Sequence, residues 1–171
     1  MKRSLRLTLV FLLWSLPLSA QQLRVYNIDV EQASATLFVA PGGKTLLMDS
    51  GKNGAGGRVK AVMDRAGVSA IDFFVLTHYH EDHDGGIDSL IALGVPVRES
   101  FDRGDKKFLT AKARGAPTYK SYQLAVGGDA QQLRRGMNVP LDPLMTVTCI
   151  SAGGAVIGGA RRSLRALMKT T

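Results

Sequence analysis

The chain has 171 residues, of which 45% are hydrophobic and 21% are charged, so it can form one compact domain with a sizeable core but hardly two. This composition excludes a disordered or collagen-like chain. The formal net charge of +8 favours an anionic substrate or surface, although no basic run interleaved with aromatic residues supports nucleic-acid binding.

The N-terminus has the pattern of an export signal. A basic start, Met1 to Arg6, precedes an apolar stretch over 7–18, and Ser19-Ala20 supplies small residues for cleavage. The apolar stretch is shorter than the ~20 residues that a membrane-spanning helix needs. We therefore expect residues 1–20 to be a signal peptide, export to the periplasm or the extracellular space, and no stable membrane span after cleavage.

Hydrophobic periodicity then predicts alternating strands and helices. Apolar or alternating patterns predict strands over 23–28, 35–40, 45–48, 71–76 and 95–98, and helical spacing predicts helices over 58–66 and 87–93. The turn at Pro41-Gly42 predicts a hairpin between the second and third strands, and Gly67 and Gly94 are expected to end the two helices. Strand, helix and strand in succession predict an α/β layered fold.

The later part of the chain has a weaker pattern. It predicts a loop over 102–105, short helices over 119–125 and 130–135, and strands over 145–150 and 155–157. Cys149, the only cysteine, excludes an intrachain disulfide and is expected to be a buried strand residue without a catalytic role.

All the histidines of the chain lie within six residues, directly after the most hydrophobic predicted strand. His78 and His80 stand two apart, so in an extended segment they point the same way, and Asp82 and His83 follow as the chain turns. Imidazole nitrogens and a carboxylate are common ligands of catalytic zinc. This pattern favours a metal site over a polar surface turn with incidental histidines, and the following Gly85 and Gly86 are expected to let the backbone turn tightly.

The histidine segment and two upstream segments resemble a known family. The stretch Thr77-His78-Tyr79-His80-Glu81-Asp82-His83-Asp84-Gly85-Gly86 resembles the His-x-His-x-Asp-His motif of the metallo-β-lactamase superfamily. Residues 28–35 resemble the Asp-Val-Gly-Gln-Gly-Asp-Ala segment of the hydrolase domain in ComEC-type DNA-uptake competence proteins, and 47–51 resemble the Ile-Asp-Thr-Gly loop of that group. The resemblance covers 23–105 well and 106–159 loosely.

The resemblance implies a metal-dependent hydrolase. It makes His78 and His80 ligands of a first metal and Asp82 and His83 ligands of a second, and it gives Asp82 the further catalytic role of orienting the attacking water. One or two zinc ions are expected, with manganese or iron as alternatives. A metal-bound hydroxide would then attack a phosphodiester, ester or amide in a small-molecule or phosphodiester substrate. Asp49 and Thr77 are expected either to support the site or to serve as turn residues.

The chain also departs from the family pattern. No histidine follows His83, and the only carboxylates after Lys106, those of Asp129 and Asp142, are not expected to replace the missing ligands. The family fold is a four-layer αββα sandwich, so we expect an α/β sandwich with an incomplete second half. The expected organisation is a partial domain over 21–159, truncated, frame-shifted or degenerate, followed by a basic tail over 160–171 of uncertain origin.

Two alternatives to an active hydrolase remain open at this point. The chain could be a non-catalytic module that binds metal or nucleic acid, because a site with open coordination positions can bind without turnover. It could also be an inactive fragment, because half a sandwich leaves a sheet face and its edges uncovered. The sequence does not determine the oligomeric state.

Overall fold

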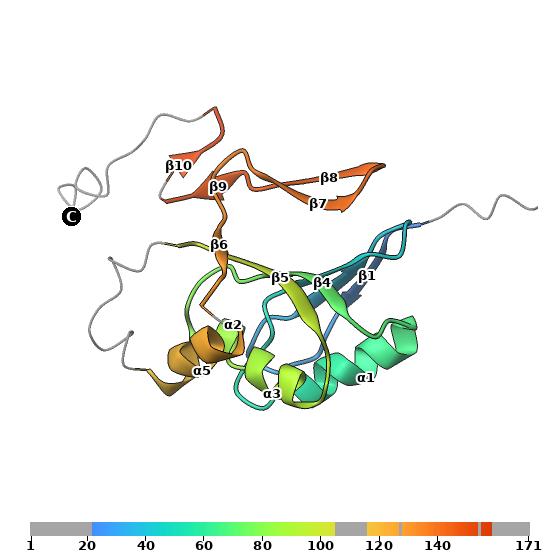
Figure 1. Ribbon diagram of the computed structural model, residues 1–171, viewed down its shortest axis with the longest axis vertical. Helices are drawn as coiled ribbons and strands as arrows, with labels where there is room; N and C mark the ends of the chain where they lie inside the picture. The colour runs from blue at the N-terminus through green and yellow to red at the C-terminus, as the bar shows by residue number, and fades with distance from the viewer. Residues whose placement is uncertain (1–21, 105–115, 127, 154, 159–171) are drawn as a thin grey trace, which may run out of the picture.

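The computed structural model describes residues 22–104, 116–126, 128–153 and 155–158. The expected signal peptide over 1–20 and basic tail over 160–171 lie outside these residues. Within the described ranges, no helix is both long and apolar enough to cross a membrane. The described residues form a central sheet with helices along one face and a β-hairpin along the other (Figure 1).

The central sheet has six strands in the order β1-β2-β3-β4-β5-β6. Their bounds are Arg24–Asn27, Thr36–Val39, Thr45–Met48, Ile71–Val75, Val97–Asp102 and Gln131–Gln132. The first three strands pair antiparallel, and β3 to β6 pair parallel. The predicted hairpin is confirmed, because β2 and β3 pair from Thr36 opposite Met48 to Val39 opposite Thr45.

Four described helices lie along one face of this sheet (Figure 1): α1 Gly56–Ala66, α2 Glu81–Asp84, α3 Ile87–Ala92 and α5 Pro117–Ala125. Helix α1 buries Val59 and Met63 in the same core as Leu47 and Phe74 of the sheet. Gly67 ends α1 in the left-handed conformation at φ +72°, as its position predicts, because glycine enters this region without a steric penalty.

The opposite face of the sheet is covered by a second, smaller β-layer. Strand β7, Asn138–Asp142, pairs antiparallel with β8, Met145–Thr148, and two short strands follow, β9 Ser151–Ala152 and β10 Ala155–Val156. Val139 and Leu141 of β7 pack against Leu46 and Phe73 of the central sheet. Asp142 fixes the hairpin in place, because its Oδ2 accepts a hydrogen bond from the Gly42 backbone N–H at 2.7 Å.

The layers confirm the expected α/β fold. Helices, a six-stranded sheet and the β7–β8 hairpin make the first three layers of an αββα sandwich. In the part of the chain that the structure describes, no helix covers the outer face of that hairpin (Figure 1). The second half of the sandwich is therefore incomplete in these residues.

Three local predictions were wrong. Residues 130–135 form no helix, because Gln131 and Gln132 pair with the end of β5. The predicted loop at 102–105 begins one residue later, since Asp102 is the last residue of β5. Cys149 follows β8 rather than lying within it, and its side chain is only half-buried. Strand β7 was not predicted, because Pro140 interrupts its short apolar pattern.

Candidate metal centre

The histidine segment begins just beyond the carboxyl end of β4. Tyr79 is buried, and its ring lies 5.0 Å from that of Tyr119 in α5. The chain bends at His78 and Tyr79, and the His80 backbone N–H donates to the His78 carbonyl at 3.2 Å. The side chain of His78 is half-buried and that of His80 is exposed. His80 has extended backbone angles at the N-cap of α2, and the first turn of that helix carries Asp82 and His83.

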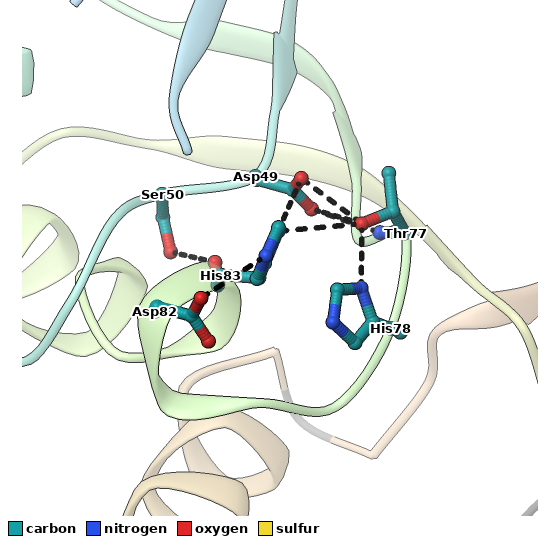
Figure 2. Close-up of polar contacts among 6 residues, drawn as sticks. All are labelled: Asp49, Ser50, Thr77, His78, Asp82 and His83. Carbon is teal, nitrogen blue, oxygen red and sulfur yellow. Dashed lines mark hydrogen bonds and ion pairs between the residues drawn. The ribbon is translucent and has the colours of Figure 1, made fainter. Parts of the chain in front are cut away.

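The structure brings the four predicted metal ligands together. The ring centroid of His78 lies 4.7 Å from that of His80 and 4.0 Å from that of His83. His83 Nε2 lies 3.4 Å from Asp82 Oδ2. Figure 2 shows His78, Asp82 and His83 gathered where the loop after β4 turns into α2. Their role as ligands stays a prediction.

Asp49, directly after β3, contacts this cluster through His83 and Thr77. Its side chain is almost fully buried, and its Oδ2 lies 2.7 Å from His83 Nδ1. Its Oδ1 accepts hydrogen bonds from the backbone N–H and the hydroxyl of Thr77, both at 2.9 Å (Figure 2). In the tautomer in which His83 Nδ1 donates to Asp49 Oδ2, the Nε2 lone pair is on the side of Asp82.

Backbone contacts fix the start of α2 between two loops. The backbone N–H and the hydroxyl of Ser50 both donate to the His83 carbonyl, at 2.8 and 2.9 Å. The Ser34 backbone N–H donates to the Asp82 carbonyl at 3.0 Å. Because each loop is hydrogen-bonded to the backbone of a predicted ligand, the cluster depends on three segments far apart in the sequence.

Gly85 and Gly86 are needed because the 50–53 loop lies against the backbone at both positions, and not because these residues adopt unusual backbone angles. Their φ angles, −72° and −95°, are open to any residue. A Cβ on Gly86, however, would lie 2.0 Å from the Ser50 carbonyl oxygen, and one on Gly85 would lie 2.4 Å from the Asn53 nitrogen. The backbone turns at both glycines, as expected, and the absence of side chains there also lets the 50–53 loop touch the helix backbone.

The charges around the cluster favour a bound cation. Burial lowers the pKa of His78, and the neighbouring His83 and His80 lower it further, so this imidazole is neutral and free to bind a metal. Asp84 is 1% exposed, and its carboxylate oxygens have no hydrogen-bond partner among the described residues. Burial raises the pKa of Asp84 to about 7, with a contribution from the charges of Glu81 and Asp82. Among the described residues, no hydrogen bond or ion pair therefore offsets the burial of the Asp84 carboxyl group.

The donors present fit a divalent metal in part. Two donors bound to one tetrahedral zinc at about 2.0–2.1 Å lie roughly 3.4 Å apart, which matches the distance between His83 Nε2 and Asp82 Oδ2. In the described ranges, no group of three or more His, Cys, Asp or Glu side chains is already arranged to hold a metal. The fit is therefore confined to the spacing of the His83 and Asp82 donors.

The late carboxylates do not complete the cluster. Asp142 ends β7, but its carboxylate accepts hydrogen bonds from Gly42 and Leu144, and Gly42 lies at the opposite end of β3 from Asp49. Asp129 lines a separate pocket with Arg98 and Glu99, near the start of β5. Both side chains are thus remote from the carboxyl ends of β3 and β4.

Two contributions to the site were not predicted from the sequence. Tyr79 anchors the histidine segment through its packing on α5, a role that its position between two outward-pointing histidines could have indicated. Asp102, buried at the carboxyl end of β5, accepts a hydrogen bond from the Tyr122 hydroxyl of α5 at 3.0 Å. Together they hold α5 against the sheet beside the motif.

Replacing Asp49 by asparagine should weaken zinc binding roughly 10- to 100-fold, because His83 would lose the charged acceptor that orients its ring. Competition with a chromophoric chelator measures this affinity. Asp72→Asn is the matched control, because Asp72 also accepts hydrogen bonds from a threonine but lies at the other end of the sheet. Equal zinc affinities in the two variants would contradict the role assigned to Asp49.

The protein therefore has a layered α/β fold in which a cluster of His and Asp side chains follows the central parallel strand β4. The chain belongs to the metallo-beta-lactamase superfamily, because the model of that family matches residues 28–159. Members of this superfamily are generally hydrolases and typically bind one or two divalent metals. A hydrolase-type function is therefore supported at the level of the family.

The chain is also similar to a solved structure, that of a metallo beta lactamase from Hirschia baltica. The identity is 20%, the TM-score is 0.34, and the match covers 68% of this chain and 51% of that one. The chain thus spans about half the length of that protein. The comparison with curated proteins found no match.

Proposed function

We propose that the chain is a metal-dependent hydrolase that uses zinc, with manganese and iron as the alternatives to be tested. This proposal rests on a series of contacts that runs from Asp49 through His83 to Asp82. The buried Asp49 holds His83 Nδ1 at 2.7 Å, and His83 Nε2 lies 3.4 Å from Asp82 Oδ2. This arrangement supports a ligand pair whose orientation is set before the metal binds.

In this proposal, His78, His80, His83 and Asp82 would hold the metal. A divalent metal there would polarise the substrate and lower the pKa of a coordinated water. Asp82, with its side chain half exposed, would accept a hydrogen bond from the attacking water and thereby orient it. Asp49 and Ser50 would keep His83 in place through its ring and its carbonyl group.

A phosphodiester is the proposed substrate, with esters and amides as alternatives. The positive net charge supports this choice, because it attracts anionic substrates over long range. The proposed relationship to ComEC-type hydrolase domains is supported by Glu31, which occupies the first glycine position of the related segment. Glu31 has φ +64°, a conformation that glycine adopts readily and other residues rarely do.

The same proposal includes the organisation of the chain. Residues 1–20 would direct export to the periplasm or the extracellular space, and 21–159 would form the hydrolase domain. The bound partner would be a small-molecule or phosphodiester substrate. Detection of the chain in the exported fraction, with a new N-terminus after residue 20, would support this assignment, and retention in the cytoplasm at full length would contradict it.

The full chain with zinc should release p-nitrophenolate from bis(p-nitrophenyl) phosphate. A chelator should abolish the release, and added zinc should restore it, because the reaction depends on the metal rather than on a nucleophilic side chain. Absorbance at the p-nitrophenolate band follows the reaction. Stoichiometric zinc binding without hydrolysis of phosphodiester, ester or amide substrates would contradict the proposed function.

A further inference from the structure

A pocket of about 360 Å³ opens beside the candidate metal centre. It is lined by Glu31, Gln32, Lys52, Glu81 and Asp82. Asp82 is the one proposed metal ligand in this lining, so the pocket adjoins the candidate metal centre at that side chain. Lys52 is the only positively charged side chain in the lining.

The segments around this pocket are fixed to one another. The backbone of Lys52 is in close contact with the motif helix, since a Cβ on Gly85 would lie 2.8 Å from the Lys52 carbonyl carbon. On the other side, the Ser34 backbone N–H is bonded to the Asp82 carbonyl, and the Gly51 N–H donates to the Ser34 carbonyl at 2.7 Å. The backbone of Lys52 is consequently held close to the segment that carries Asp82.

Glu31 fixes the other end of the Lys52 side chain. Its carboxylate forms an ion pair with the Lys52 ammonium and a second one with Arg58, whose Nη2 lies 2.8 Å from Glu31 Oε1. The hydrogen bond from Lys52 is the main cause that lowers the pKa of Glu31 below its usual value. The Glu31 carboxylate is therefore shared by two cations, and Arg58 has a second acidic neighbour, because its Nη1 lies 3.7 Å from Asp29 Oδ2.

The Lys52 ammonium keeps donors available for a ligand. An ammonium has three N–H donors, and in the described ranges only the bond to Glu31 uses one of them. About half of the side chain is exposed. The remaining negative charge in the pocket comes from Glu81 and Asp82, and in the proposed function the metal neutralises Asp82. A bound anion would then meet an ammonium already held in position, which lowers the entropy cost of binding.

We propose that Lys52 is a specificity-determining residue, whose ammonium binds an anionic phosphoryl oxygen of the substrate beside the metal. This inference rests on the proposed function for the identity of the substrate. Glu31 and Arg58 position the lysine, and the lysine selects a phosphodiester over a neutral ester. A charge-assisted hydrogen bond of this kind contributes specificity as well as affinity.

The first test compares two substrates with zinc-loaded full chain. Lys52→Met should raise the KM for the anionic bis(p-nitrophenyl) phosphate about tenfold, which is the loss expected for one charge-assisted hydrogen bond. The KM for the neutral p-nitrophenyl acetate should not change. Lys52→Arg should restore most of the loss, because it keeps the charge. An equal rise in KM for both substrates would overturn the proposal.

Lys60→Met is the matched control, because Lys60 is another partly exposed lysine paired with a carboxylate, that of Asp64 within α1. Its kinetics should equal those of the wild-type chain for both substrates. If Lys60→Met raised the KM for the anionic substrate as much as Lys52→Met, the effect would reflect the net charge of the protein. The proposal would then be overturned.

A second measurement does not depend on catalysis. A calorimetric titration of the zinc-loaded chain with inorganic phosphate measures the affinity for phosphate. This affinity should be about tenfold weaker in Lys52→Met than in the wild type or Lys60→Met. Equal phosphate affinities in all three chains would overturn the role of Lys52. Phosphate binding that depends on Lys52 in a chain without any hydrolysis would support that role and contradict the proposed function alone.

Discussion

Replacing His78 and His80 together by alanine should abolish zinc binding and reduce hydrolysis to the uncatalysed background. The double variant would leave only His83 and Asp82 of the proposed donors, and two ligands are too few for a stable zinc site. The fold should persist, because neither histidine belongs to the hydrophobic core. Elemental analysis of the purified chain gives the zinc content, and circular dichroism checks the fold.

The control for this double variant is Glu81→Gln. Glu81 lies between His80 and Asp82 and is exposed, but it is not among the proposed ligands. Its replacement changes the charge of the motif while leaving the donors intact, so the zinc content should stay at the wild-type value. An unchanged zinc content in the His78→Ala/His80→Ala chain would contradict the assignment of these histidines as metal ligands.

Replacing Gly86 by alanine should cause the largest loss of stability among the single substitutions considered, about 3 kcal/mol or more. The new Cβ would lie 2.0 Å from the Ser50 carbonyl oxygen. Ser50 cannot easily move away, because its backbone N–H and hydroxyl are both bonded to the His83 carbonyl. Relief of the clash would therefore displace His83 as well. Urea unfolding followed by circular dichroism measures the free-energy change.

Gly57→Ala is the matched control for this substitution. Gly57 lies in the first turn of α1 and is exposed, whereas Gly86 is buried at the N-cap of α3, and a Cβ on Gly57 would meet no atom within 4 Å. Alanine is favoured over glycine in a helix by about 1 kcal/mol at interior positions, so at this first-turn position the variant should be at least as stable as the wild type. A Gly86→Ala chain as stable as the wild type would contradict the close contact between the 50–53 loop and the motif.

The sequence predicted those elements whose signals are local. The apolar run over 71–76 corresponds to β4, Ile71–Val75, because a strand buried on both faces needs continuous apolar residues. The helical spacing before Gly67 corresponds to α1, and the turn at Pro41-Gly42 to the β2–β3 hairpin. Each of these elements is specified by residues within a short window.

Elements that depend on distant partners were not predictable in this way. Strand β6 consists of two glutamines, and only its pairing with Phe101 and Asp102 makes it a strand. Strand β7 contains Pro140, and its position depends on the packing of Val139 and Leu141 against the central sheet. Neither dependence leaves a periodic pattern in the local sequence.

The candidate site likewise combines features that short-range sequence patterns predict with contacts between distant residues that they do not. The proximity of His78, His80 and His83 was expected from their short spacing, and their rings lie together where the chain bends after β4 and enters α2. The contact between Asp49 and His83 joins residues 34 positions apart, and the resemblance to a known loop gave the only hint of it. The pairing of Lys52 with Glu31 could not be inferred, because both lie in loops without a periodic pattern.

The most direct test of the account is the metal content of the purified full chain after dialysis against trace zinc, measured by elemental analysis. The account predicts at least one zinc ion retained per chain, held by the donors at the carboxyl end of β4 and the start of α2. A folded chain, shown by a cooperative melting transition, that retains no zinc would contradict it.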